Sequence, residues 1–568
     1  MKSTLFRMLV WAILLIFFAA CSGEDKLEPS ITIETTGEFI IDAKVNAKTT
    51  ISFTSTYAWQ ASTDASWMVI TPTKGNAGNA TISILAKEEN RTGDIRNGVL
   101  TITSEGISKN ITIQQDATEV INVKQNEYNI GQEGGECILE YTSNIRNAQF
   151  TISEDNLPDW ISYTLPKGRA MQEGTIKLTI AANRSFTDRT AKIFIQAVDA
   201  NDLDKVLLKS QVINITQEKA SVGTSTDYVT GDKKVFQLQK HSKGNGVPVV
   251  FMGDGFLDKD IESGYYRQAM EKGMELFFTE EPVRSLREYF DVWMVTAVSQ
   301  NNAFGGGYST KFACVLAGNG STLISGNHDM VETYTNLVPE IGGNTQLFNE
   351  TIAIVILNSN EYAGTCYFGF SGAGEFAIGY CPMIDHINSE NFRRVLCHEC
   401  IGHGFTKLLD EYAYESQGTI PASEIESTRR MQQMGWAANV DFTNSRENVL
   451  WKQFINDARY KGKDAFGEEL GVYEGACTYW RGAYRPTNQS MMNSNIHGFN
   501  APSREAIYKR IMKVAYGSQW QYDYEEFVNF DLKHLPQPRS AGSRSAEENR
   551  IPQLPAPIFV GKPLNSTH

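Results

Sequence analysis

Two stretches between residues 27 and 218 repeat one another, and this repetition limits how the N-terminal part of the chain can fold. The paired positions keep one constant offset: Trp67 with Trp160, Gly75 with Gly168, Asn90-Arg91 with Asn183-Arg184, and Arg96 with Arg189. Gln115-Asp116 and Gln217-Glu218 close the two copies in matching Ile-x-Ile-x-Gln contexts. Because the same sparse features recur at one spacing, each copy is expected to be a structural unit with its own core.

Short runs of alternating polar and apolar residues lie between these anchors. Ala80 to Leu85 in the first copy and Ile176 to Ile180 in the second are examples. Alternation at a period of two, interrupted by Gly and Asn turns, indicates β-strands with one buried face. Several such strands per copy predict two all-β immunoglobulin-like sandwiches, one over residues 27–117 and one over residues 118–220.

The order of these features, a Trp, a Lys-Gly turn, an Asn-Arg pair and a closing strand that ends in Gln, resembles the BACON domain in both copies. That family is associated with carbohydrate-active and mucin-directed surface proteins of gut Bacteroidetes, so the resemblance implies glycan contact as one role. The alternative, which we favour, is a stalk that holds the rest of the chain away from a membrane. We expect the repeated Trp to be a buried core residue rather than a platform for a sugar.

A second constraint is the segment His398-Glu399-Cys400-Ile401-Gly402-His403. A helix with this composition can present two imidazoles to a zinc ion and a carboxylate to the water that the metal activates. Here the histidines stand five residues apart (403 − 398 = 5), and in a regular α-helix that step rotates the second by about 140°. A π-type turn absorbs the extra residue. We therefore predict such a turn around Cys400 to Gly402, with Gly402 easing the distortion.

The surroundings of this segment favour a helix that ends close to the second histidine. Ser389-Glu390 provides a helix start, and Gly402 and Gly404 provide a stop. The five-residue spacing resembles the motif of dipeptidyl peptidase III, in which the helix accommodates the inserted residue. The alternative is an ordinary amphipathic helix whose neighbouring apolar residues form a core stripe.

From about residue 225 the pattern changes to strands that alternate with helices. Buried strands are predicted at Val247 to Phe256, Phe290 to Val298 and Ile352 to Leu357, a helix at Ile261 to Phe278, and an edge strand before the motif helix at Phe376 to Cys381. Such alternation predicts an α/β sandwich. Asp254, in the loop after the first of these strands, is expected to brace that loop, with ion binding as the alternative.

Several stretches together resemble the IgA-peptidase family of zinc metallopeptidases. The matching stretches are Met252 to Phe256, Pro282 to Val298, His398 to Phe405, Leu408 to Tyr412, Tyr484 to Met492 and Asn500 to Ala506. The family's familiar motif spaces its histidines by four residues, and this chain departs from it by one. Covering roughly residues 225 to 520, the resemblance implies an α/β zincin-like metallopeptidase domain, assigned here to residues 225–535, with endopeptidase activity.

The resemblance and the donor chemistry predict a Zn²⁺ site. Neutral His398 and His403 are expected to bind the metal, and Asp410 is expected to be the third protein ligand. Glu411 and His497 are the alternatives for that third position. Asp410 lies seven residues past His403 (410 − 403 = 7), so the chain must turn back after the helix.

Catalytic roles follow from the same reading. Glu399 is expected to act as the general base that takes a proton from the activated water and delivers it to the leaving amine. Tyr484 is expected to donate a hydrogen bond to the tetrahedral oxyanion, with His497 as the alternative. Ser490-Met491-Met492-Asn493 resembles the methionine-containing turn that lies beneath the metal in related peptidases.

The first residues carry a targeting signal. Lys2 and Arg7 precede an apolar run, Leu9 to Ala20, that is too short to span a bilayer, and Cys21 follows directly. This resembles a bacterial lipoprotein signal, with residues 1–20 removed, lipid on Cys21 and a linker over residues 21–26; an ordinary secretory signal is the alternative. The acidic residues after Cys21 resemble the surface-export signal of Bacteroidetes lipoproteins. We expect an outer-membrane lipoprotein exposed on the cell surface, with the periplasmic side as the alternative.

Composition narrows the partners. The formal net charge of −14 argues against binding to nucleic acid or an anionic membrane surface. Seven cysteines remain after Cys21, too few and too scattered for a disulfide framework, and we expect them to pack in cores. Residues 536–568 contain Pro, Ser, Arg and Glu without a clear apolar period, so this tail is expected to be poorly ordered.

The sequence therefore predicts a cell-surface zinc endopeptidase that acts on protein or glycoprotein substrates. The alternative from another class is an adhesin or glycan- or mucin-binding lipoprotein whose zincin-like domain is inactive. Because the base and both histidines are present, the sequence favours the enzyme.

Overall fold

The computed structural model describes residues 27–560 except 146, 154, 156, 165–172, 319, 371–373, 461–467, 496–497 and 536–553. The expected signal segment, the lipidation site Cys21, the linker 21–26, Gly168 and His497 lie outside the described residues. Within the described part, every helix is too short or too polar to cross a membrane. The chain divides into two compact units, Met1–Asn122 with Thr142–Ala148, and Val123–Tyr141 with Gln149–His568.

The first unit is a β-sandwich built from the strands that the alternating runs predict. One sheet has the order β1 (Ile31–Ile33), β3 (Lys48–Ser55), β7 (Gly78–Ala86), β5 (Met68–Thr71). The other has the order β2 (Phe39–Ile41), β9 (Ile107–Gln115), β8 (Arg96–Ser104), β4 (Trp59–Thr63), β6 (Lys74–Gly75). Apolar residues of both sheets form one buried core, which includes Phe53, Trp59, Trp67, Ile82 and Leu100.

The second sequence copy also folds into short strands, which belong to the second unit. One sheet has the order β10 (Ile121–Val123), β12 (Gly135–Ser143), β15 (Glu173–Ile180), β14 (Ile161–Thr164). A second has the order β11 (Glu127–Ile130), β19 (Ile213–Gln217), β16 (Arg189–Ile193), and a third has the order β13 (Ala148–Ile152), β17 (Ile195–Asp199), β18 (Asp202–Lys209). The N-terminal part of the chain is thus mostly β-sheet, as the alternating runs predict.

The repeated tryptophans are core residues in both copies. Trp67 is 6% exposed and Trp160 is 7% exposed. In each copy an arginine guanidinium covers the ring, Arg96 at 5.0 Å from the Trp67 centroid and Arg189 at 4.4 Å from that of Trp160. The prediction that these rings are buried is confirmed, and a ring covered by a cation on its face offers no stacking surface to a sugar.

The other repeated residues hold the ends of the strands together. Gln115 Oε1 accepts from Arg96 Nε and Gln217 Oε1 accepts from Arg189 Nε, both at 2.8 Å. Asn90 Nδ2 donates to the carbonyl of Asp94, and Asn183 Nδ2 to that of Thr187, the residue four positions later in each copy. The repeated signature is therefore a structural one, because its polar groups are used inside each sandwich.

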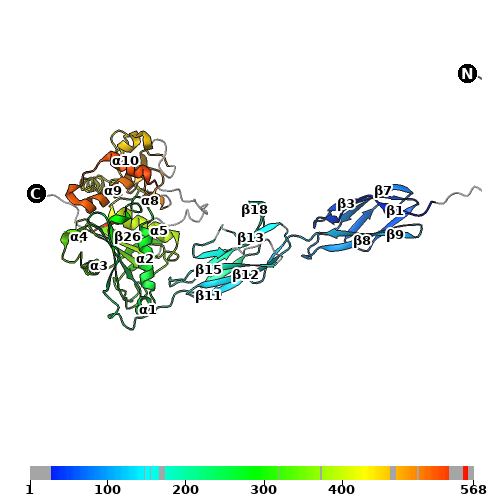
Figure 1. Cartoon of the computed structure of the whole chain (residues 1–568), viewed down its shortest axis with the longest axis horizontal. Helices are drawn as coiled ribbons and strands as arrows, with labels where there is room; N and C mark the ends of the chain where they lie inside the picture. Colours follow the sequence, from blue (N-terminus) through cyan, green and yellow to red (C-terminus); the bar gives the residue numbers. More distant parts are fainter. Residues whose placement is uncertain are drawn as a thin grey trace, which may run out of the picture. The chain divides into compact units, whose positions relative to one another are not determined.

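The remainder of the second unit is an α/β region around a mixed sheet (Figure 1). Its strand order among the described residues is β20 (Val235–Gln239), β22 (Phe290–Val295), β21 (Val247–Asp254), β25 (Ile352–Leu357), β27 (Ala377–Pro382), β26 (Thr365–Phe368), β31 (Ile558–Phe559). β22, β21, β25 and β27 are parallel, whereas β20 and β26 run antiparallel to their neighbours. An all-β region followed by an α/β region confirms the predicted fold class.

Helices cover both faces of this sheet. One core lies between the sheet and α2 (Tyr265–Phe277), α5 (Glu390–Leu396), the π-helix η3 (Cys397–Phe405), α9 (Ala501–Tyr516) and α10 (Tyr524–Lys533). The other core receives side chains from α3 (His328–Thr335). The remaining helices are α1 (Asp258–Glu262), α4 (Thr345–Asn349), α6 (Ala422–Gln433), α7 (Lys452–Asn456) and α8 (Met491–Ser494).

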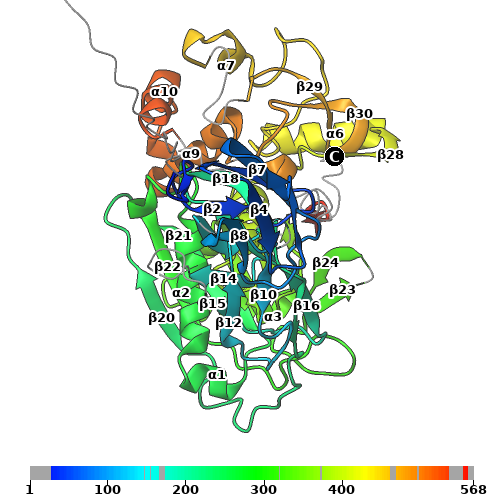
Figure 2. The ribbon, with the colours of Figure 1, turned by 90° about the vertical axis from the view of Figure 1, so that its right-hand side faces the viewer.

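Two smaller sheets accompany the large one. β28 (Ala413–Thr419), β30 (Thr478–Arg485) and β29 (Tyr473–Ala476) form a three-stranded sheet, which lies near α6 in the yellow and orange part of Figure 2. β23 (Val315–Gly318) and β24 (Ser321–Ser325) form a hairpin. The three-stranded sheet is placed by the chain that follows Asp410, because β28 begins three residues later (413 − 410 = 3).

The buried strands and the helix predicted for this region are present, with one correction. Phe376 to Cys381 was expected to be the edge strand, but β27 lies between β25 and β26. β26 is the outer strand of this pair, and it runs in the opposite direction to β27. Every residue of β27 is buried, which is what a strand flanked on both sides requires.

Asp254 braces the loop after β21, as one of its two readings predicts. Its carboxylate accepts from Ser299 Oγ at 3.2 Å, Thr310 Oγ at 2.7 Å, Phe312 N at 3.0 Å and Cys314 N at 3.1 Å. Four donors satisfy the buried carboxylate without a cation.

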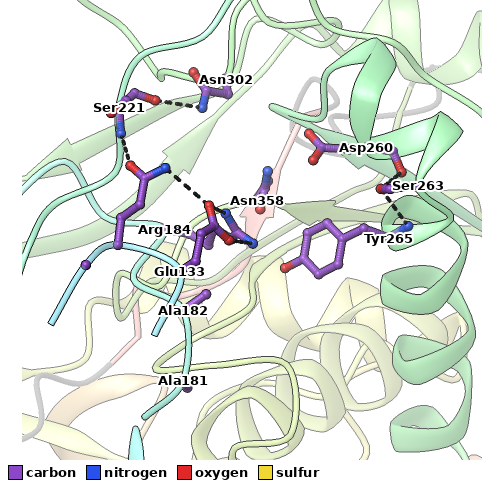
Figure 3. A network of polar contacts seen from close by, with 12 residues as sticks. Glu133, Ala181, Ala182, Arg184, Ser221, Asp260, Ser263, Tyr265, Asn302 and Asn358 are labelled. Carbon is purple, nitrogen blue, oxygen red and sulfur yellow. Dashed lines mark hydrogen bonds and ion pairs between the residues drawn. The ribbon is translucent and has the colours of Figure 1, made fainter. Parts of the chain in front are cut away.

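The second sandwich packs against the α/β region through side chains of the repeat (Figure 3). The Arg184 guanidinium lies 5.1 Å from the centroid of the Tyr265 ring at the start of α2 and pairs with Glu133 at 3.1 Å. His386 Nε2, in the loop before α5, donates to the carbonyl of Asp159 at 2.6 Å. Arg91, which holds the position of Arg184 in the first copy, has a side chain that is 81% exposed, against 23% for Arg184.

This difference between equivalent residues gives a matched test. Arg184→Ala removes a partly buried cation–π contact worth about 1–2 kcal/mol, so the melting temperature of the second unit should fall by about 2–4 °C. Arg91→Ala removes only an exposed ion pair and should leave the melting profile unchanged. Differential scanning calorimetry of both variants measures this. Equal shifts in the two variants would contradict the proposed packing of Arg184.

Candidate metal centre

The helix that carries the motif starts at a capped N-terminus. The Ser389 hydroxyl accepts from Phe392 N at 3.0 Å, which satisfies a free N–H of the first turn of α5. Arg393, buried on this helix, pairs with Glu280 and Glu390. The predicted start at Ser389-Glu390 is therefore confirmed, and these contacts anchor the helix before the motif begins.

From Cys397 to Phe405 the helix is a π-helix. Thr406 N donates to Ile401 O at 3.1 Å, a five-residue step that continues the wider winding past its end. The wider turn brings the imidazoles of His398 and His403 together, with ring centroids 4.6 Å apart. The predicted π-type turn is confirmed, and it extends over the whole motif rather than over one turn.

Gly402 allows a close approach rather than an unusual backbone conformation. A Cβ at this position would lie 2.3 Å from Met492 Sδ. Gly402 is also absent from the residues with positive φ, so its backbone conformation is open to other residues. The Met492 side chain therefore packs directly on the helix between the two histidines, and the methionine-containing turn lies beneath the motif as expected.

Both histidines are oriented through Nδ1. His398 Nδ1 lies 2.9 Å from Met491 O, and His403 Nδ1 lies 2.7 Å from Leu408 O. A carbonyl oxygen can only accept, so each Nδ1 carries a proton, which leaves Nε2 as the ring atom that can face a metal. This second hydrogen bond is how metal-binding histidines are commonly held in position.

The chain turns back after the π-helix and brings Asp410 to the same point. Lys407 has a φ of 58°, a left-handed conformation that ends the helix. Asp410 Oδ1 lies 3.2 Å from His398 Nε2 and 3.4 Å from His403 Nε2. One ligand atom from each of the three residues lies within 4.8 Å of the other two, and all three residues are buried.

The donor atoms of this cluster lack other partners within the described part of the chain. The Nε2 atoms of His398 and His403, both Asp410 carboxylate oxygens and both Glu399 carboxylate oxygens are buried without a hydrogen bond of normal geometry. Buried polar atoms are normally paired, so this concentration of unpaired atoms needs an explanation. Two imidazole nitrogens and a carboxylate are a donor set that Zn²⁺ prefers, so the residues fit a metal.

The charges of the cluster depend strongly on one another. Burial would lower the pKa of His398, but the hydrogen bond to Asp410 and the nearby carboxylates raise it to about 9. Burial would raise the pKa of Asp410, but the two histidines hold it below its ordinary value. Burial raises the pKa of Glu399 to about 7.

The Glu399 carboxylate lies close to the main chain that leads into β26. A Cβ on Gly364, the residue before β26, would lie 3.2 Å from Glu399 Oε1 and 2.6 Å from Val395 Cγ1. The glycine therefore lets the main chain that leads into β26 pass directly beside the Glu399 carboxylate.

Glu411 takes a structural position instead of facing the cluster. Its carboxylate accepts from Ser490 Oγ at 2.7 Å, Asn439 Nδ2 at 2.9 Å and Asn500 Nδ2 at 3.0 Å, and Glu411 N donates to Met492 O at 2.8 Å. Of the alternatives for a third ligand, Glu411 thus fixes the methionine-containing turn, and His497 lies outside the described residues.

Tyr484 is not brought to the cluster by any contact among the described residues. Its main chain pairs with Asp441 and with Glu474 in β29, and burial with the charge of Glu474 raises the pKa of its phenol. A different tyrosine, Tyr362, lies near Glu399: burial, with Glu399 among the further causes, raises the pKa of Tyr362 to about 12. Asn495, directly after α8, donates to the Tyr362 hydroxyl at 3.5 Å. The sequence contains no motif that marks Tyr362 as a site residue. Its only signal is its place two residues before Gly364.

The described cysteines are free thiols, and all but Cys477 are buried. Cys400, inside the π-helix, lies with its Sγ 3.7 Å from that of Cys381 in β27. Its thiol points to the sheet, where it also lies against Gly379 of β27. The expectation that these cysteines pack in cores agrees with these positions.

Comparisons with known proteins match both parts of the chain. Residues 236–461 match the family model described as IgA Peptidase M64. Residues 57–116 and 150–218 match the model of BACON, described as a putative binding domain, N-terminal. Both resemblances drawn from the sequence are confirmed by these matches, and the match to the peptidase model lies in the α/β region. No curated protein matches the chain.

Solved structures share only partial likeness. A Bacteroides ovatus GH5 xyloglucanase in complex with a XXXG heptasaccharide is 22% identical over 18% of this chain and 22% of its own, with a TM-score of 0.15. Mouse clustered PcdhgC3 EC1-3 is 12% identical over 34% of this chain and 69% of its own, with a TM-score of 0.23. Titin Ig tandem domains A164-A165 are 9% identical over 34% of this chain and 98% of their own, with a TM-score of 0.20.

The contact between Gly402 and Met492 can be tested by a double-mutant cycle. Gly402→Ala places a methyl group against Met492 Sδ and should lower the free energy of unfolding by about 1–3 kcal/mol. In a Met492→Ala background the same substitution should cost much less, because the clashing atom is gone. Urea unfolding of the metal-free chains measures both values. An equal cost in the two backgrounds would contradict the packing described here.

Proposed function

We propose that this metallopeptidase is a zinc-dependent endopeptidase that hydrolyses peptide bonds of protein or glycoprotein substrates. The observation that carries the proposal is the group of buried, unpaired donor atoms on His398, His403 and Asp410, with the unpaired Glu399 carboxylate beside them. A structural zinc site has four protein ligands, whereas a catalytic site keeps a position open for water and substrate. Three protein donors and an adjacent carboxylate suit the catalytic kind.

Each residue has a defined task in this proposal. His398 and His403 would hold the zinc ion through Nε2, and Asp410 would hold it through its carboxylate. A bound zinc ion supplies Lewis acidity, which polarises a peptide carbonyl and makes a water molecule more acidic. Glu399 accepts the proton of the attacking water and transfers it to the leaving nitrogen, since its carboxylate is not engaged by the protein.

The oxyanion of the tetrahedral intermediate needs a hydrogen-bond donor. Tyr362 is a stronger candidate for this task than Tyr484, because it contacts Asn495 directly after α8 and stands two residues before Gly364, which adjoins Glu399. Burial raises the pKa of its phenol to about 12, so the hydroxyl keeps its proton at neutral pH. Tyr484 remains a prediction of the sequence, and a Tyr484→Phe variant with unchanged kcat would exclude it from the chemistry.

Removal of one ligand or of the base should have separable effects. His403→Ala should lose bound zinc, measured as metal per chain by mass spectrometry, and with it peptide hydrolysis. Glu399→Gln should keep the metal and lose about 10²–10⁴-fold in kcat. His241→Ala changes a histidine that pairs with Asp291, so it serves as the control and should retain both. Full cleavage of a mixed protein substrate by Glu399→Gln would exclude Glu399 as the base, and no cleavage by the zinc-loaded wild type would favour the adhesin.

We further propose that the chain is an outer-membrane lipoprotein exposed on the cell surface and anchored through lipid on Cys21. The apolar run before Cys21 and the acidic residues after it support this. Cys21→Ala should abolish labelling by a fatty-acid probe and release the protein from the membrane fraction. Membrane association of that variant, with its signal removed, would contradict the anchor.

A further inference from the structure

The C-terminal segment 554–560 returns to the large sheet and covers its outer strand. β31 pairs with β26 in a parallel register, Ile558 with Tyr367 and Phe559 with Phe368, and Val560 N donates to Phe368 O at 2.9 Å. The sequence predicts a poorly ordered tail over residues 536–568, and for this segment that prediction is wrong. The physical reason is its apolar content, because Leu554, Ile558 and Phe559 have surfaces that the two cores can bury.

The side chains of the segment are held on both faces of the sheet. Phe559 packs edge-on against Phe368, with ring centroids 6.0 Å apart. A Cβ on Gly369 would lie 2.2 Å from the Phe559 ring, so the glycine makes the space for it. Ile558 packs against the opposite core, and Leu554 is 1% exposed. These contacts are specific ones, not those of a chain lying loosely on a surface.

The beginning of the segment reaches the metal centre. The Tyr412 hydroxyl donates to the carbonyl of Leu554. Tyr412 stands two residues after Asp410 (412 − 410 = 2), and its side chain is buried. Since the strands are parallel, the residues before Ile558 run back along β26 toward Gly364, which adjoins Glu399. Leu554 is thus separated from a predicted metal ligand by one side chain.

The outer strand of a sheet is the surface that binds an extended peptide through main-chain hydrogen bonds. β26 is such a strand, and the chain leading into it passes beside the proposed general base. A protein substrate held there would lie next to the cluster of His398, His403 and Asp410. The segment 554–560 occupies this same strand.

The segment contains two prolines, and their positions are compatible with a strand that forms hydrogen bonds with β26 on one side only. N–H groups of alternate residues in a strand point to the same side, and that of Val560 points to β26. Positions 555 and 557 therefore face outward, and both are proline, which has no N–H to offer. Prolines at outward positions prevent a further strand from joining the edge.

We propose that the outer edge of β26 is the peptide-binding surface of the enzyme and that residues 554–560 of the same chain are its resident, inhibitory occupant. This inference rests on the proposed endopeptidase function. Substrate must displace the segment before it can reach the centre, so the measured KM equals the KM of the open enzyme divided by the fraction of molecules in which the edge is free. The peptides that fit are extended and carry bulky apolar side chains at alternating faces, as Ile558 and Phe559 do.

The full-length variant Ile558→Asp/Phe559→Asp tests the inference. Two charges placed in the cores should release the segment, lowering KM for a protein substrate by about tenfold or more while kcat stays unchanged. The matched control is Val560→Asp, which adds a charge to a side chain that is already 42% exposed and should leave KM as it is. An unchanged or raised KM in the double variant, with normal zinc content, would overturn the proposal.

A binding measurement makes the result independent of catalysis and of the folding of one variant. A labelled peptide Leu-Pro-Ala-Pro-Ile-Phe-Val should bind a chain that ends at Leu535 and that keeps the zinc content and circular dichroism of the full-length chain. Fluorescence anisotropy should show binding to the full-length chain that is about tenfold weaker or more. The peptide should also inhibit the shortened enzyme competitively, whereas a scrambled peptide should not. Absence of binding to the shortened, zinc-loaded chain would overturn the inference.

The outcomes also separate the two proposals. If the full-length and shortened chains bind zinc but neither cleaves protein, the proposed endopeptidase function is wrong. The peptide-binding measurement still tests whether residues 554–560 occupy the edge of β26. If the full-length chain cleaves and release of the segment changes nothing, only the inhibitory role fails.

Discussion

The site depends on the winding of one helix, and that winding is set by contacts with the methionine-containing turn. The π-helix brings His398 and His403 to one side. Met491 O fixes the first imidazole, and Met492 packs where Gly402 has no side chain. A regular α-helix would leave the second imidazole about 140° away. The loss of hydrogen-bond quality in the wider helix is offset by burial and by these contacts with a distant segment.

The surrounding structure holds that turn in place. Glu411 binds it through Ser490 and through the main chain of Met492, and Asn439 and Asn500 satisfy the rest of the carboxylate. Two adjacent acidic residues therefore have different tasks: Asp410 faces the imidazoles without another partner, and Glu411 is fully engaged. Burial makes this division stable, because an unpaired carboxylate in a core is costly unless a cation or a proton compensates it.

Much of this could be predicted from the sequence where the signal is local. An apolar run predicts the strand β25, and the alternation of polar and apolar residues predicts the sandwiches. The one extra residue between the two histidines predicts the π-helix. Asp410 could be preferred from the sequence with Glu411 as an alternative, but the sequence does not show the reason for their different orientations, which lies in partners such as Ser490, far along the chain. Tyr362 and the outer position of β26 gave no pattern, because a strand's place in a sheet depends on which distant strands pair with it. Among the described residues, only the short β31 lies beyond β26.

The sequence by itself determined two local patterns: the two-residue alternation of the sandwich strands, and the one extra residue between the histidines of the motif helix. These patterns determine which residue types share a face of a strand or helix. These are properties of a few consecutive residues, governed by backbone geometry. Only the tertiary structure decided the contacts between distant segments. Met492 packs on Gly402, Leu554 accepts a hydrogen bond from Tyr412, and the tail pairs with β26. Such contacts depend on the shape of cores assembled from the whole chain, and no local period encodes them.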